Sequence, residues 1–209
     1  MSVNPTELLK NAYGGTFEEN IKTVLNKHFN SEIAENLWNQ TCEKYSEFLQ
    51  NHNIPEDDED AVYYILPSVA VYRVLQNFEA AGKACKFDAL SIFREIYFID
   101  GKRGNDYLIN RFREDSAFLK GFPQDFLKTV GEGKCEVIAD TPEYTEFHVK
   151  KCRFVELTKE LGCPEICSVF CELDTLMYTD LHPNLFYSRE KTLYAGDDCC
   201  NFSMRYIGK

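Results

Sequence analysis

The stretch KCEVIADTPEYTEFHVK, residues 134–150, decides the fold class, because the spacing of the apolar residues changes there. Residues 135–140 and 144–150 alternate between apolar and polar side chains, as half-buried strands do, and Thr141-Pro142 supplies a turn between them. Upstream of residue 134 the apolar residues recur at helical spacing instead. Helices followed by antiparallel strands predict an α+β fold.

Upstream of this stretch, the pattern predicts a layer of helices. Thr16 with Glu19 forms a capping box, and Ser31 can cap a second helix. Residues 61–81 are apolar almost all round, which indicates a buried helix with Pro67 at a kink or in a first turn. Asp88 can cap the next helix, and Gly101 to Gly104 predicts a turn after it. Gly131 and Gly133 are expected to end the helical part.

Downstream, helical spacing returns over residues 152–161, and Gly162-Cys163-Pro164 indicates that one helix stops and another starts. Two closing strands are expected over 187–195 and 200–207, joined by residues 196–198. The predicted order is therefore a helical layer followed by β-β-α-α-β-β. The four strands and two helices of the second part form an antiparallel-sheet segment. We expect a single domain over 1–209, mainly helical over 1–132, with the site in the α+β part over 133–209.

The composition excludes several classes of partner. The 209 residues include 34 acidic and 23 basic side chains, for a net charge of −11, which argues against binding to nucleic acid or anionic lipid. The N-terminus lacks the basic and apolar regions of a signal peptide, and no apolar run reaches the length of a membrane span. We therefore expect a cytoplasmic protein whose nine cysteines are thiols. The sequence leaves open whether it forms a homo-oligomer.

Three cysteines, Cys163, Cys167 and Cys171, recur every four residues and would lie on one helix face. With Cys200 or His148 as a fourth ligand they could hold a metal, although buried cysteine is more often a small hydrophobic residue. Cys152 and Cys163 also fall near predicted helix N-termini, where the helix dipole can lower a thiol pKa. A nucleophilic thiol would need a base, and the candidates are His148 and His182.

The closing hairpin offers a candidate anion site. In a regular strand Tyr187, Arg189, Lys191 and Leu193 share one face, and Thr192 lies on the other. An arginine beside a threonine could bind a small carboxylate through a bidentate contact. The alternative is that these charges simply pair across an exposed hairpin.

Several blocks of the sequence resemble the L-2-amino-thiazoline-4-carboxylic acid hydrolase family. They are a Cys that opens a helix at Cys152, the Gly-Cys-Pro-Glu break at 162–165, the Cys-x-x-Asp of Cys171 and Asp174, and the terminal stretch from Thr192 to Phe202. Together they lie within about residues 144–206. The last hairpin also resembles the closing segment of 4-vinyl reductase-type ligand-binding domains, which implies a related α+β architecture.

The first resemblance implies a hydrolase that opens a small cyclic amidine carboxylate to N-carbamoyl-cysteine. Such a reaction requires a base that activates water, a cation that holds the carboxylate and a group that stabilises the leaving sulfur. The resemblance implies Asp174 or His148 as the base, and Arg189 with Thr192 as the carboxylate-binding pair. Cys171 and Cys200 would line the pocket as a polar wall, as a nucleophile or as metal ligands, and Cys152 would contribute to substrate binding. No cofactor is expected, apart from the alternative of a Cys/His-bound metal.

One residue departs from the family pattern. The terminal block usually reads Cys-Asp-Phe, whereas this chain has Cys200-Asn201-Phe202. If the family carboxylate is catalytic, the chain would be a non-catalytic sensor or carrier of a small carboxylate. If that side chain only caps a turn, asparagine replaces it readily.

Overall fold

The computed structural model describes residues 5–55, 57–82, 88–131 and 135–208, so Gly133 lies outside the described residues. The chain forms two compact units. Unit 1 contains residues 1–100 and 153–169, and unit 2 contains residues 101–152 and 170–209. In the described part of the chain, no helix has both the length and the apolar character needed to cross a membrane.

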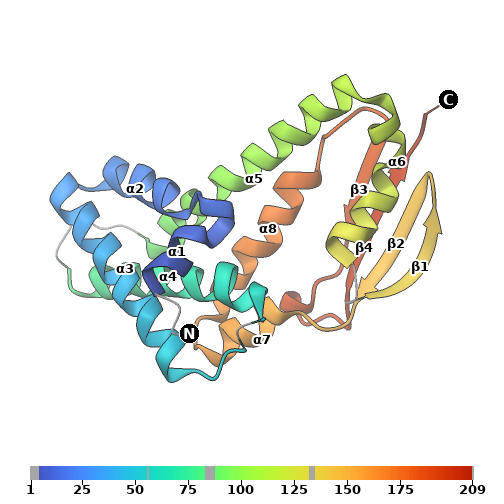
Figure 1. The fold of residues 1–209 in the computed structure, drawn as a ribbon. Helices are drawn as coiled ribbons and strands as arrows, with labels where there is room; N and C mark the ends of the chain where they lie inside the picture. The colour runs from blue at the N-terminus through green and yellow to red at the C-terminus, as the bar shows by residue number, and fades with distance from the viewer. Residues whose placement is uncertain (1–4, 56, 83–87, 132–134, 209) are drawn as a thin grey trace. The chain divides into compact units, whose positions relative to one another are not determined.

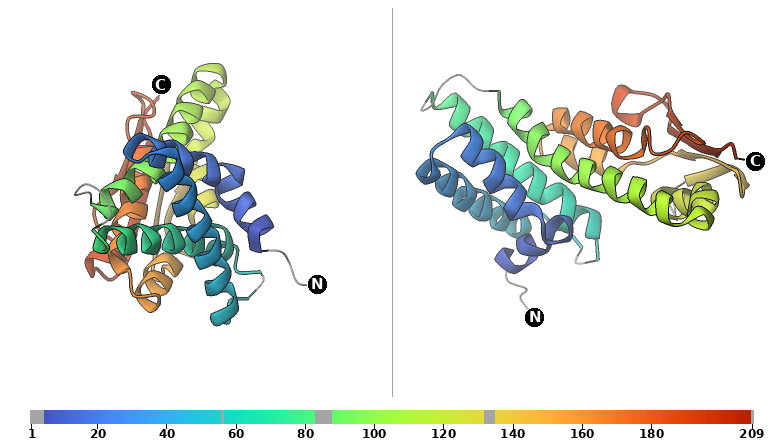
Figure 2. Two further views of the ribbon diagram at one scale, coloured as in Figure 1. Left: turned by 90° about the vertical axis from the view of Figure 1, so that its left-hand side faces the viewer. Right: turned by 90° about the horizontal axis from the view of Figure 1, so that it is seen from above.

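Unit 1 is helical. Its helices α2, α3 and α4 lie side by side, and α3 packs along α4 (Figure 2). A π-helical segment, η2 (Asp60–Ile65), leads into α4, whose first turn contains Pro67. Unit 1 also contains the shorter elements α1, η1, α7 and η4. The bounds are α1 (Pro5–Asn11), η1 (Ala12–Gly15), α2 (Phe17–His28), α3 (Ser31–Asn51), α4 (Leu66–Ala80), α7 (Arg153–Glu160) and η4 (Pro164–Ile166).

The caps of these helices differ partly from the expected ones. Asp88 accepts hydrogen bonds from the backbone N–H groups of residues 90 and 91, as predicted. The prediction of a Thr16 capping box is wrong, because the Thr16 hydroxyl donates to the Tyr13 carbonyl and to Asp100 instead. Helix α3 is capped by Asn30 rather than by Ser31, which is its first helical residue.

Unit 2 is an antiparallel four-stranded sheet packed against helices (Figure 1). The strand order is β1-β2-β4-β3, which confirms the predicted α+β fold and the β-β-α-α-β-β order. Helices α5 and α8 each contribute residues to both units. The bounds are α5 (Ala89–Glu114), α6 (Ser116–Phe126), η3 (Leu127–Gly131), β1 (Cys135–Thr141), β2 (Tyr144–Val149), α8 (Cys167–Tyr178), β3 (Leu185–Arg189), η5 (Leu193–Ala195) and β4 (Cys200–Tyr206).

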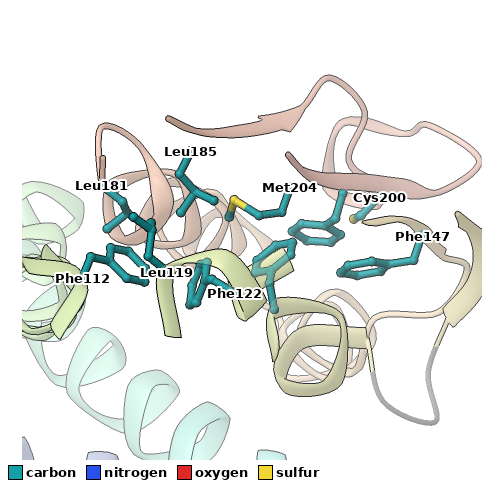
Figure 3. Close-up of a cluster of buried hydrophobic side chains, with 10 residues drawn as sticks. Phe112, Leu119, Phe122, Phe147, Leu181, Leu185, Cys200 and Met204 are labelled. Carbon is teal, nitrogen blue, oxygen red and sulfur yellow. The ribbon is translucent and has the colours of Figure 1, made fainter. Parts of the chain in front are cut away.

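One face of the sheet forms the core of unit 2. Phe147 on β2 lies opposite Phe202 on β4, and their rings stack with centroids 5.3 Å apart. Helix α6 covers this face, and the buried Thr145 hydroxyl donates to the Pro123 carbonyl of α6. Alternation along each strand therefore places residues 145 and 147 of β2 and residues 200, 202 and 204 of β4 in the core. Figure 3 shows Phe147, Cys200 and Met204 among the buried apolar side chains.

The prediction of a turn at Gly101 to Gly104 is wrong, because α5 continues through both glycines. They serve close packing against α8 instead. A Cβ atom at Gly101 would lie 2.4 Å from a methyl carbon of Leu173, and one at Gly104 would lie 2.6 Å from the terminal methyl of Met177. A glycine that makes a turn and a glycine that allows close packing look the same in the sequence. Only the presence of the neighbouring helix distinguishes the two roles.

The prediction of a strand over 187–195 is also wrong in its bounds. Strand β3 covers Leu185–Arg189, and residues 193–195 form a 3₁₀ turn. Beyond Arg189, side-chain oxygens rather than a neighbouring strand accept the hydrogen bonds of the backbone N–H groups. Asn201 accepts from the N–H groups of residues 190 and 191, and Asp197 accepts from the N–H of Thr192. A segment whose N–H groups are already bound by side chains has no need of a partner strand.

We expect Gly101→Ala to lower the free energy of unfolding by about 1–2 kcal/mol, because the added methyl overpacks the contact with Leu173. Gly121→Ala in α6 is the matched control. Nothing lies within 4 Å of its Cβ position, so the better helix propensity of alanine should raise stability by about 0.5–1 kcal/mol. Urea unfolding of both variants measures the difference. A Gly101→Ala variant as stable as Gly121→Ala would contradict close packing at residue 101.

Candidate functional site

A buried guanidinium and a half-exposed carboxylate form an ion pair in unit 2. Arg189 Nη1 donates to Asp174 Oδ2 over 2.8 Å. The Arg189 side chain is 5% exposed, whereas the Asp174 side chain is 40% exposed. The pair therefore has a fixed, desolvated side and a side that solvent can reach.

The elements around Arg189 explain its fixed position. It is the last residue of β3, on the core face opposite Phe202, and its guanidinium carbon lies 5.3 Å from the centre of that ring. Its second terminal nitrogen, Nη2, donates to the Cys171 carbonyl and to the Thr175 hydroxyl of α8. Arg189 thus joins the end of β3 to one face of α8. Thr175 and Phe202 were not predicted as partners of Arg189, although Thr175 follows Asp174 directly and Cys171 by one helical turn.

The environment shifts the protonation of Asp174. Burial raises the pKa of this carboxyl to about 6, and the Arg189 cation opposes that rise. Asp174 is consequently ionised at neutral pH and becomes protonated in mildly acidic solution. A carboxylate that titrates close to neutral pH is suited to take a proton from water.

Three of the predicted pocket cysteines gather near this pair. The Cys200 thiol interacts electrostatically with Cys152, Cys171 and Arg189. Cys200 itself is buried in the core of unit 2 and accepts a hydrogen bond from the Leu193 N–H over 3.3 Å. Burial raises the pKa of Cys200 to about 11, so it is a neutral thiol at physiological pH. This environment suits a wall residue better than an ionised nucleophile.

The structure separates His148 from this cluster. Its neighbours along β2, Phe147 and Val149, lie on the core side of the register, opposite Phe202 and Cys200. His148 therefore faces the other side of the sheet, opposite Asn201, and its Nε2 lies 3.6 Å from a carboxylate oxygen of Glu146. Of the two candidate bases, only Asp174 lies beside Arg189.

Thr192 and Asn201 organise the loop that precedes β4. Thr192 caps the 3₁₀ turn η5, and its hydroxyl accepts from the Ala195 N–H. The Asn201 side-chain oxygen accepts from the Glu190 and Lys191 N–H groups at 3.0 and 2.6 Å. A carboxylate oxygen would make the same two contacts. Position 201 therefore has a turn-forming role that either asparagine or aspartate can fill.

The remaining cysteines provide no evidence for a metal site. Cys163 and Cys167 are buried in unit 1, and burial raises the pKa of Cys163 to about 11, against the expected effect of a helix N-terminus. Across the residues that the structure describes, no three His, Cys, Asp or Glu side chains are grouped so that they could hold a metal ion.

A groove in unit 2 lies one helical turn from Asp174. It has a volume of about 550 Å³ and is formed by α5, α6, η3 and the C-terminal end of α8. Met177 and Tyr178 line it, and these residues share a face of α8 with Asp174. Burial, reinforced by the Asp174 charge, raises the pKa of Tyr178 to about 12, so its hydroxyl is neutral. This groove was not predictable from the sequence, because its walls come from segments far apart in the chain.

We expect Asn201→Asp to retain both backbone contacts and to change the free energy of unfolding by less than about 0.5 kcal/mol. Asn201→Ala removes the acceptor and should cost about 1 kcal/mol. Urea unfolding tests both variants. Equal stability of the alanine and aspartate variants would show that these contacts contribute nothing to the loop.

The protein-family model of L-2-amino-thiazoline-4-carboxylic acid hydrolase matches residues 64–204 of the chain. No curated protein is significantly similar to the chain. The family match covers more than half of the 209 residues and includes Asp174, Arg189, Cys171 and Cys200. The chain belongs to the L-2-amino-thiazoline-4-carboxylic acid hydrolase family.

Proposed function

We propose that the protein hydrolyses a small cyclic amidine carboxylate, with L-2-amino-thiazoline-4-carboxylic acid as the first candidate substrate. The observation that supports this function best is the ion pair of Asp174 and Arg189, which lies inside the region matched by the family. It provides a carboxylate that is held in place on one side and open to water on the other. The proposed reaction needs water and side chains of this chain, and no cofactor.

The reaction adds one water molecule across the amidine. Water attacks the ring carbon between nitrogen and sulfur, and Asp174 takes one of its protons. That proton passes to the ring nitrogen. The carbon–sulfur bond then breaks, the sulfur leaves with the bonding electrons, and it takes the proton of the new hydroxyl group. The product is N-carbamoyl-cysteine, which carries a free thiol.

We propose a role for Arg189 that differs from the one that the resemblance implies. Its carboxylate partner is Asp174 of the same chain, and its side chain is nearly inaccessible to solvent. We therefore assign Arg189 as a positioning residue, which holds Oδ2 of Asp174 and leaves Oδ1 for water. Cys171, Cys200 and Cys152 remain proposed wall residues near the pair. Thr192 would act only through the loop that it caps.

Asp174→Asn should lower kcat for thiol release at least about 100-fold, because the amide cannot accept a proton from water. The assay is incubation with L-2-amino-thiazoline-4-carboxylic acid followed by titration of free thiol. Glu172→Gln on the same helix is the matched control and should retain activity. If the wild-type protein releases no thiol but is stabilised against heat by the compound, the chain is a binding protein rather than a hydrolase.

The pH dependence of kcat/KM tests whether Asp174 acts as the base. A base must be ionised, so we expect kcat/KM to be lost as the pH falls through about 6, the pKa of Asp174. The Arg189 cation lowers that pKa, so Arg189→Met should move the acidic limb to higher pH, whereas Arg189→Lys should keep it closer to the wild-type position. Circular dichroism checks that both variants fold. An acidic limb that does not move in folded Arg189→Met would contradict the proposed role of this pair.

A further inference from the structure

The groove beside Asp174 has apolar walls and a charged rim. Phe118, Phe122 and Phe126 of α6 and Tyr178 of α8 supply aromatic rings to it, and Met177 supplies a thioether. These rings contact one another, with Phe126 and Tyr178 centred 4.9 Å apart in an edge-to-face arrangement. Such walls favour a flat ring over an extended chain.

Lys128 is the only cation among the residues that line the groove in the described part of the chain. Its Nζ lies 3.9 Å from Asp125 Oδ1, and the Lys128 side chain is 74% exposed. An exposed ion pair at this distance contributes little, so the ammonium group can change partner at low cost. Asp125 also lines the groove and would repel an anion there.

Helix α8 connects this groove to the proposed base. Residues 174, 177 and 178 are spaced three and four apart, so their side chains are neighbours on one face of the helix. Tyr178 also contributes to both regions, because it lines the groove and interacts electrostatically with Asp174. A ring lying against Met177 and Tyr178 would therefore have its edge one helical turn from the Asp174 carboxylate.

We propose that this groove binds a small planar ring that carries a carboxylate, and that Lys128 binds the carboxylate. The placement of the reacting carbon near Asp174 rests on the proposed function. Lys128 is thus the specificity-determining cation, a role that the buried Arg189 cannot fill while it holds Asp174. The aromatic walls of the groove favour a flat ring, and Lys128 at its rim favours a ligand that carries a negative charge.

The test uses thiazole-4-carboxylate and its matched probe, thiazole, which lacks the carboxylate. Isothermal titration calorimetry should show that Lys128→Ala weakens binding of the carboxylate about tenfold and leaves binding of thiazole unchanged. Lys128→Arg should restore most of the affinity. Asp125→Asn should strengthen binding of the carboxylate, because it removes a repelling charge. Both substituted positions, 125 and 128, are exposed at the rim of the groove, so all three variants should fold.

Thiol release by the wild-type protein separates this inference from the proposed function. Lys128-dependent binding of thiazole-4-carboxylate without thiol release would support the groove and contradict the hydrolase. Thiol release with the same KM in wild type and Lys128→Ala would support the hydrolase and overturn the role of Lys128. Absence of binding of thiazole-4-carboxylate to the wild-type protein would also overturn the groove proposal.

Discussion

The contact between Arg189 and Asp174 is the constraint on which the arrangement of the site depends. A guanidinium that is almost fully withdrawn from water requires a compensating charge and hydrogen-bond acceptors. Asp174, the Cys171 carbonyl and the Thr175 hydroxyl supply them, and all three lie on α8. The end of β3 is thereby joined to one face of that helix. The same contact orients the one carboxylate proposed to act on water.

Helix α8 carries both closely packed apolar side chains and the polar residues of the candidate site. Leu173 and Met177 of α8 face Gly101 and Gly104 of α5, where any larger residue would collide. Asp174 lies between these two contacts in sequence, and Tyr178 follows them at the groove. This packing holds α8 against α5 and thereby fixes the positions of the neighbouring side chains of Asp174 and Tyr178. A site built on a packed helix is held more firmly than one built on a loop.

The fold class was predictable from local patterns. The change from helical to strand spacing near residue 134 indicated α+β, and the strands β1, β2 and β4 lie where alternation predicted them. The predictions were wrong where one type of residue can have several structural roles. Glycines 101 and 104 break no helix, because their role is set by a neighbouring helix. The strand predicted to extend to residue 195 ends at Arg189, because side chains of Asn201 and Asp197 bind its N–H groups.

The fold class, the order of the elements and the family could be predicted from the amino-acid sequence, since they depend on periodicity and on short motifs. The three-dimensional structure was needed to show that Asp174 lies beside Arg189 while His148 faces the opposite side of the sheet. The structure was also needed to show that the Asn201 side chain binds the backbone that follows β3, and that a groove lies near α8. The physical reason is that desolvation, ion pairing and hollows depend on which segments meet in space, and spacing along the chain carries no record of that.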